Sequence, residues 1–150
     1  MSIAGKPERG GPHGPSSEGM AGDADAYPAA AALREALRTF QRRSEQITRA
    51  NGLTERTYQL LLMIKTGREM SGRASLRELE ERLQLGKSTV IELVLRAEER
   101  RLVRRELDRR RRREISVRLT REGERRLARA FAELGDERAR LVELFADEEL

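Results

Sequence analysis

The sequence predicts a mainly α-helical fold with one small β-wing, and three observations support this fold class. Apolar residues recur at helical spacing along most of the chain. Leu85-Gly86 interrupts that spacing briefly, as the turn of a helix-turn-helix does. After the helical spacing that follows this turn, apolar residues alternate with polar ones at the period of a strand, at Ile115, Val117 and Leu119. We therefore expect a winged helix-turn-helix flanked by N- and C-terminal dimerisation helices.

Residues 1–26 are expected to form a disordered tail. They contain six of the twelve glycines and three of the four prolines of the chain. Such a segment buries too little apolar surface to offset the entropy that ordering costs. The folded domain is therefore expected over residues 27–150.

The first helix is expected over residues 27–50. Pro28 suits its first turn, and Asn51-Gly52 suits its C-terminal end. One face steps by four and three residues, which is the spacing of a narrow helix–helix seam. The positions on this face are Leu33, Leu37, Phe40, Ser44 and Ile47.

A second helix is expected after the capping residue Thr54. Its predicted core residues are Tyr58, Leu61, Leu62 and Ile64. Thr66-Gly67 ends this helix, and residues 67–74 are expected to form a loop.

The helix-turn-helix is expected to start at Ser75, since Ser75-Leu76-Arg77-Glu78 has the form of a capping box. Ser88-Thr89 offers a cap for its second helix. The buried face of that second helix is predicted from helical spacing to hold Val90, Leu93, Val94 and Ala97.

The last helix is expected over residues 120–148, with Thr120 as its cap and a break possible at Gly135-Asp136. Its seam holds Leu127, Phe131, Leu134, Arg138, Leu141 and Phe145. Two terminal helices with matching seams predict a homodimer; the alternative is that each seam packs on its own domain. The predicted dimer interface consists of Leu33, Leu37, Phe40, Ile47, Leu127, Phe131, Leu134, Leu141 and Phe145.

The positive charge of the chain is concentrated in one segment. The formal net charge is +5, but residues 100–113 alone carry +7, from nine arginines against Glu106 and Asp108. Five of these arginines, Arg109 to Arg113, fall on the predicted tip of the hairpin. A localised basic patch is typical of phosphate binding, whereas the alternative is a merely solvated charge run.

The composition argues against an enzyme. Cysteine is absent, and the single histidine, His13, lies in the predicted tail, so neither a thiolate metal site nor a Ser/His/Asp arrangement can form. We expect no metal and no cofactor. No apolar run approaches the roughly 18 residues of a membrane helix, and the N-terminus lacks the apolar core of a signal peptide. A soluble, cytoplasmic protein without a membrane partner is therefore expected.

Over about residues 30–146 the sequence resembles the MarR family of bacterial-type transcriptional regulators. The resemblance rests on the order and spacing of several short pieces rather than on one motif. These pieces are Leu53-Thr54, Lys87-Ser88-Thr89-Val90, Leu93-Val94, Arg96, Glu98 to Val103, Leu119-Thr120 and Glu122-Gly123.

The resemblance implies a two-fold homodimer that binds an inverted-repeat operator in double-stranded DNA. Each protomer would place its recognition helix in a major groove and its wing in the flanking minor groove. By position, Arg113 corresponds to the wing arginine that enters the minor groove. The DNA-binding residues expected in this way are Lys87, Ser88, Thr89, Ile91, Glu92, Arg96, Arg109, Arg110, Arg111, Arg112 and Arg113. Many relatives release DNA when a small aromatic or phenolic ligand binds, so the resemblance also suggests an effector, whose identity the sequence does not give.

Three departures from the family pattern keep other functions open. Arg111 stands where the wing commonly has Asp, and Arg101 stands where a glycine is usual. Ile91, Glu92 and Leu95 replace residues that are mostly polar or basic. The leading hypothesis is a sequence-specific transcriptional regulator. The alternatives are a winged-helix protein-interaction module, suggested by Ile91 and Leu95, and a nonspecific DNA-compacting protein.

Overall fold

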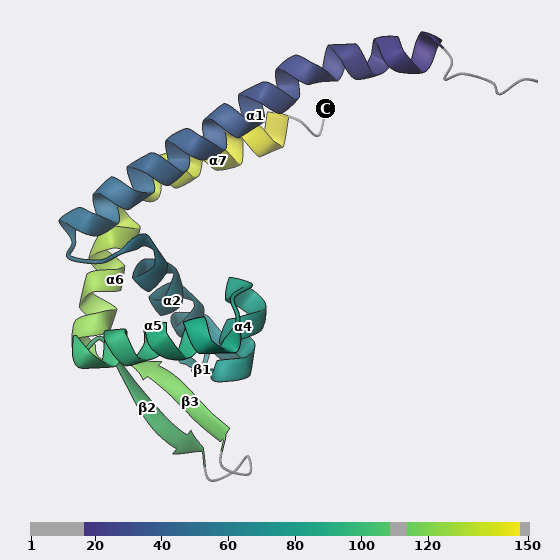
Figure 1. Ribbon diagram of the computed structural model, residues 1–150. Coiled ribbons are helices and arrows are strands. Elements are labelled where there is room, and N and C mark those ends of the chain that lie inside the picture. Colours follow the sequence, from purple (N-terminus) through teal and green to yellow (C-terminus); the bar gives the residue numbers. More distant parts are fainter. Residues whose placement is uncertain (1–16, 109–113, 148–150) are drawn as a thin grey trace, which may run out of the picture. The chain divides into compact units, whose positions relative to one another are not determined.

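The computed structural model describes residues 17–108 and 114–147 and confirms the expected fold class (Figure 1). The described residues form helices and one small antiparallel sheet. In chain order the elements are α1 (Ser17–Ala50), α2 (Glu55–Lys65), α3 (Gly67–Met70), β1 (Arg73–Ser75), α4 (Leu76–Leu83), α5 (Lys87–Glu99), β2 (Val103–Asp108), β3 (Glu114–Leu119), α6 (Arg121–Glu133) and α7 (Gly135–Asp147).

The chain divides into two compact units, and the boundary between Ala36 and Leu37 lies inside α1. The described part of the first unit is helical from Ser17 onward. Residues 17–26, expected as tail, are thus part of a helix. The three tail prolines all precede residue 16, but the tail glycines Gly19 and Gly22 lie within α1. Pro28, expected in the first turn of a helix, also lies inside α1 because the helix begins at Ser17.

The second unit is held together by an apolar core between the sheet and helices α2, α4, α5 and α6. The predicted core residues Tyr58, Leu61, Ile64, Val90, Val94 and Ala97 are all buried, while Leu62 and Leu93 are partly buried against them. The other buried apolar residues are Leu53, Leu60, Ala74, Leu79, Leu102, Val103, Val117, Leu119, Leu127, Ala130 and Leu134.

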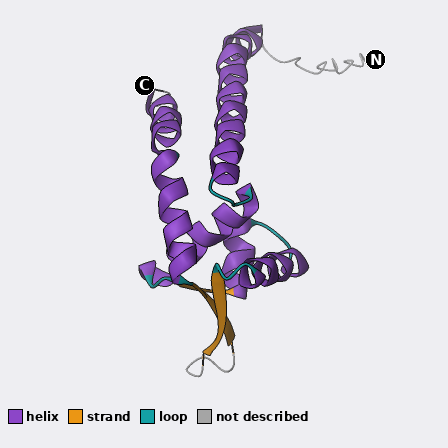
Figure 2. Cartoon of the chain, turned by 90° about the vertical axis from the view of Figure 1, so that its left-hand side faces the viewer, coloured by secondary structure: helices purple, strands orange, loops and turns teal. Residues whose placement is uncertain are grey.

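The sheet has the strand order β1-β3-β2, with both pairs antiparallel. Strands β2 and β3 form the predicted hairpin and project beyond the helices (Figure 2). The prediction of a loop over residues 67–74 was wrong, because this stretch contains α3 and the start of β1. A strand of three residues is too short to show alternation, and its partner β3 lies far away in the sequence.

Three helix caps expected from the sequence are confirmed. The hydroxyl groups of Thr54, Ser75 and Thr120 accept hydrogen bonds from backbone amides three residues later, each at 3.1 Å. The cap of α5 is instead Gly86, not Ser88-Thr89. Gln84 adopts a left-handed conformation with φ of 55°, which turns the chain so tightly that α5 begins at Lys87.

The expected last helix is divided in two, since α6 ends at Glu133 and α7 begins at Gly135. Leu127 and Leu134 belong to the core of their own chain, with Leu134 only 2% exposed. Their assignment to a dimer interface was therefore wrong: a spacing of four and three serves packing within a chain as well as between chains. Ile47 also packs against this core, though it is only partly buried.

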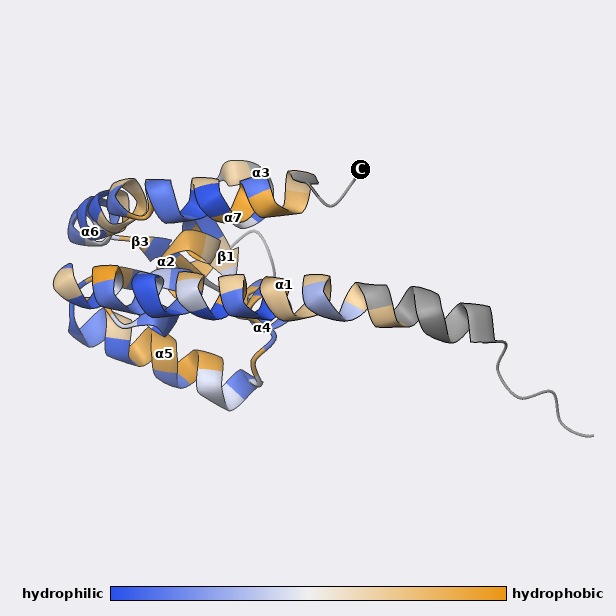
Figure 3. Cartoon of the chain, turned by 90° about the horizontal axis from the view of Figure 1, so that it is seen from above, coloured by the Kyte–Doolittle hydropathy of each residue, from blue (hydrophilic) through white to orange (hydrophobic). Residues whose placement is uncertain are grey.

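Other predicted seam residues keep accessible surface. Phe131 and Phe145 are exposed, and Leu141 is partly exposed. Hydrophobic residues recur along α7 (Figure 3), where Val142 is 64% exposed and Leu144 is 46% exposed. Within the same unit, α7 is linked to the C-terminal part of α1 by an ion pair between Arg43 Nε and Glu137 Oε1 at 3.5 Å.

Candidate nucleic-acid interface

Helix α5 presents one buried face and one polar face. Val90, Val94 and Ala97 anchor it to the core. The opposite side of the helix exposes most of Glu92 and Arg96 and part of Ile91. All of the DNA-binding residues predicted before the wing lie on this helix, namely Lys87, Ser88, Thr89, Ile91, Glu92 and Arg96.

Glu92 and Arg96 form an ion pair on the exposed face of α5. Arg96 Nη2 lies 2.5 Å from Glu92 Oε1, one helical turn away. Both side chains are mostly exposed, so the pair is screened by water and contributes little to stability. Its consequence is chemical, because Glu92 neutralises a cation that would otherwise be available to a phosphate.

A hollow of about 320 Å³ lies between the start of α2 and the first turns of α5. Arg56 and Arg96 contribute cationic groups to its lining, and Glu55 and Glu92 contribute carboxylates. Arg56 was not predicted as a site residue, because only the fold brings the start of α2 beside α5. Together Arg56 and Arg96 could hold one phosphate group, provided that Glu92 releases Arg96.

The wing is tied to α5 by a bidentate ion pair. Arg105 Nε and Nη2 on β2 donate to Glu98 Oε2 and Oε1 of α5 at 2.8 and 3.0 Å. The hydrogen bonds from Arg105 lower the pKa of the Glu98 carboxyl group, although slight burial opposes this effect. The pair links β2 to α5, and so joins the wing to the helix that exposes Glu92 and Arg96.

The base of the wing is closely packed against α6. A Cβ atom on Gly123 would lie 2.0 Å from the carbonyl oxygen of Leu102, so only glycine fits there. Thr120 donates from Oγ1 to the Arg101 carbonyl at 2.6 Å. Arg101, which stands where the MarR pattern has glycine, adopts a left-handed φ of 61° that glycine would adopt with less strain.

The tip of the wing lies outside the described residues. Arg109, Arg110, Arg111, Arg112 and Arg113 are all in the undescribed segment, so their assignment to DNA binding stays a prediction.

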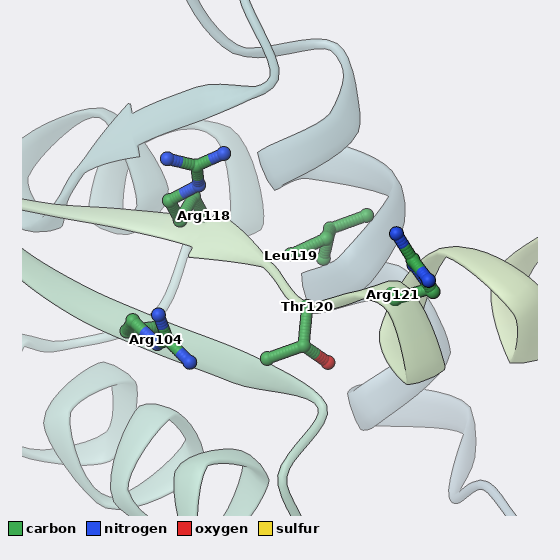
Figure 4. A pocket seen from close by; sticks show the side chains of 5 residues that line it. All are labelled: Arg104, Arg118, Leu119, Thr120 and Arg121. Carbon is green, nitrogen blue, oxygen red and sulfur yellow. The ribbon is translucent and has the colours of Figure 1, made fainter.

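Sequence reasoning missed another set of arginines at the base of the wing. Arg104, Arg118 and Arg121 line a hollow of about 240 Å³ together with Leu119 and Thr120 (Figure 4). Arg73 of β1 pairs with Arg118 of β3 in the sheet register. Only this register brings the residues together, so no local motif could have indicated the cluster.

The described residues hold no group of three or more acidic or histidine side chains arranged to bind a metal ion. None of the described helices is both long enough and apolar enough to span a bilayer.

The comparison with solved structures identifies the fold. AbsC, a MarR family transcriptional regulator from Streptomyces coelicolor, aligns with a TM-score of 0.69 and 24% sequence identity, over 81% of this chain and 81% of that chain. The chain has the MarR fold. A MarR family protein from Bacillus stearothermophilus gives a TM-score of 0.68 at 24% identity, over 85% of this chain and 86% of its own.

A third structure with the MarR fold was solved together with DNA. A mutant of MarR from E. coli complexed with operator DNA has a TM-score of 0.63 and 16% identity, over 79% of this chain and 83% of its own. No protein-family model and no curated protein matches the sequence. Within this fold, α5 is the second helix of the helix-turn-helix, and β2 with β3 forms the wing.

Proposed function

We propose that this chain is a MarR-family transcriptional regulator that binds operator DNA as a homodimer. The observation that carries the proposal is the exposed polar face of α5, held beside a wing that concentrates the positive charge of the chain. The complex of the E. coli MarR mutant with operator DNA supports it, since that protein shares this fold.

In this proposal α5 enters a major groove and reads base edges. Ile91 contacts a thymine methyl group, and Glu92 accepts a hydrogen bond from a cytosine amino group. Lys87 and Arg96 bind phosphates and so set the register of the helix. The arginines of the wing tip, Arg109 to Arg113, provide minor-groove and phosphate affinity, with Arg113 entering the groove.

We further propose that the exposed apolar residues of α7 are covered by a second copy of the chain. Three large apolar side chains of α7 stay exposed in the single chain, and an exposed apolar patch of this kind usually marks a contact with another molecule. They are Val142, Leu144 and Phe145. Leu37 and Phe40 on α1 are only partly buried and provide further apolar surface. A dimer formed in this way presents two copies of α5, which matches an inverted repeat.

A gel-shift assay with promoter fragments, competitor DNA and stepped salt tests the function. A sequence-specific regulator stays bound to one promoter fragment when competitor DNA is in excess. Its affinity for that fragment falls as salt rises, because phosphate contacts are weakened. Equal loss of all fragments to competitor indicates nonspecific DNA binding. No shift at any salt concentration contradicts the proposal.

The second candidate function is a protein-interaction module. It is favoured by Leu95, which is 40% exposed one turn beyond the partly exposed Ile91. If this apolar pair binds a protein, Ile91→Asp and Leu95→Asp abolish partner capture and leave promoter binding unchanged. A small-molecule effector stays a prediction of the family resemblance.

A further inference from the structure

The sheet carries a row of arginines on the face opposite to its core. In the register, Arg118 of β3 lies between Arg73 of β1 and Arg104 of β2. Residues paired across antiparallel strands point to the same side of a sheet. Together with Arg121, the first residue of α6, these three arginines define the outer wing face.

The outer wing face points away from α5. Side chains alternate along a strand, so Arg105, which bonds to Glu98 of α5, lies on the side opposite to Arg104. Val117 and Leu119 on β3 are buried on that same inner side. The outer wing face is therefore separate from the recognition face of α5.

The outer wing face has more positive charge than its neighbours neutralise. Glu106 is shared, with one carboxylate oxygen 3.3 Å from Arg118 Nη1 and the other 3.8 Å from Arg73 Nη2. Among the residues whose side chains the structure describes, which leaves out Asp108, no carboxylate lies within 4.0 Å of the guanidinium nitrogens of Arg104 or Arg121. By contrast, Arg105 is paired with Glu98.

The position of Arg121 is also unfavourable for the helix that it begins. A cation in the first turn opposes the helix dipole, and Arg121 is the first residue of α6. Thr120 uses its hydroxyl group to cap α6 and to bond the Arg101 carbonyl. Glu122 and Glu124 in the same turn offset the effect on the helix dipole, but their ion pairs are with Arg125, Arg126 and Lys65 and not with Arg121. Arg104 and Arg121 line the same hollow from either side of Thr120 (Figure 4), and anions bound there would reduce the repulsion among these cations.

We propose that the outer wing face binds backbone phosphates of DNA that flanks the segment read by α5. This inference rests on the proposed function. Strands β2 and β3 project beyond the helices (Figure 2). In the proposed complex, the DNA beyond the segment read by α5 passes along the outer side of this projection. Guanidinium groups bind phosphate oxygens in pairs, and a row of them across three strands suits a chain of phosphates better than one small anion.

The test uses two duplexes that contain the same bound site, found by the gel-shift assay. The short duplex covers about 20 base pairs, which spans two half-sites, and the long duplex adds about 15 base pairs on each side. Binding is measured at several salt concentrations for the wild type and for Arg104→Gln/Arg121→Gln. The control is Arg125→Gln/Arg129→Gln, which removes the same charge from exposed positions of α6 away from the hollow.

The proposal predicts that the wild type binds the long duplex more tightly and with a steeper salt dependence than the short one. In Arg104→Gln/Arg121→Gln, the slope of log K against log salt should become shallower by about two on the long duplex only. The control variant should keep the wild-type difference between duplexes. Thermal unfolding of each variant verifies that it is folded.

Three outcomes overturn the proposal. If the wild type binds both duplexes but the double variant behaves like the control, the outer wing face does not bind DNA, and the proposed function stands. Binding of inorganic pyrophosphate is measured for the same proteins; if the double variant loses it but keeps the length effect, the site takes a free anion instead. If the gel-shift assay finds no bound site, both the proposed function and this inference fail.

Discussion

Arg96 Nη2 lies 2.5 Å from Glu92 Oε1 on the exposed face of α5, so this face neutralises one of its own cations. DNA binding of the kind proposed here has to break or share this ion pair. Glu92 therefore opposes phosphate binding at sites that offer it no hydrogen-bond donor. In the proposed complex, Glu92 would therefore lower affinity for DNA in general and raise selectivity for sites that offer it a hydrogen-bond donor.

Glu92→Gln should raise affinity for DNA that lacks the preferred site, because Arg96 becomes available and a negative charge is lost. Titration of a random-sequence duplex should show tighter binding and a salt slope steeper by about one. Glu99→Gln is the matched control, since it removes the same charge from the far end of α5, and it should change little. Equal effects of the two substitutions would mean that only net charge matters.

Acid should weaken the link between the wing and α5. The pKa of Glu98 is lowered in the folded protein by its hydrogen bonds from Arg105. A carboxyl group with a lowered pKa stabilises the fold above its unfolded pKa, and this contribution is lost as pH falls through the folded value. This contribution to folding stability is small, because the side chains of Arg105 and Glu98 are 43% and 35% exposed to water.

The pKa of Glu98 can be followed directly by carbon NMR of its carboxyl group. In Arg105→Gln the pKa should rise toward the ordinary glutamate value, while other carboxyl groups keep theirs. The same titration curve for Glu98 in the wild type and in Arg105→Gln would contradict the geometry of this ion pair.

Gly123→Ala should destabilise the protein by about 1–3 kcal/mol, because the added methyl group meets the carbonyl of Leu102 and forces the backbone to shift. Gly135→Ala is the control: its nearest contact would be a flexible arginine atom at 3.8 Å, so its stability should be equal or higher. Chemical denaturation of both variants measures the difference in unfolding free energy. A Gly123→Ala protein as stable as the wild type would show that α6 does not approach β2 this closely.

The dimer proposed here depends on exposed residues of α7 and not on the core. Val142→Asp/Phe145→Asp should give a folded monomer, since both side chains are exposed in the single chain. Leu134→Asp should instead unfold the protein, because Leu134 is buried. Light scattering gives the mass, and circular dichroism reports folding. A wild-type mass equal to one chain at micromolar concentration would end the dimer proposal.

Local signals in the sequence predicted the elements that depend on local contacts. Each cap by Thr54, Ser75 or Thr120 involves only the next three residues, so its pattern could be recognised. The capping box at Ser75 was only half right, since Glu78 accepts from the backbone amide of Arg68 at 3.0 Å. That contact depends on α3, which has no periodic signal in a helix of four residues.

The candidate site residues on α5 could be predicted from the sequence, but the arginines on the outer face of the sheet could not. Helical spacing places Glu92 and Arg96 opposite Val90 and Val94, so the exposed face follows from the sequence. The row of arginines on the outer wing face depends on the pairing of β1 with β3, which joins distant segments. The prediction that the seam of α6 forms a dimer interface was wrong for a related reason. Spacing alone does not say whether Leu127 is covered by its own chain or by a second chain.

Footprinting on one bound promoter fragment, with the wild type and Glu92→Ala, tests the central claim most directly. A dimer that reads DNA through α5 should protect two half-sites of an inverted repeat, about 10 base pairs apart from centre to centre. Glu92→Ala should broaden base choice at one position in each half-site. A footprint without inverted symmetry, or one indifferent to changes at Ile91 and Glu92, would contradict the account and favour the protein-interaction module.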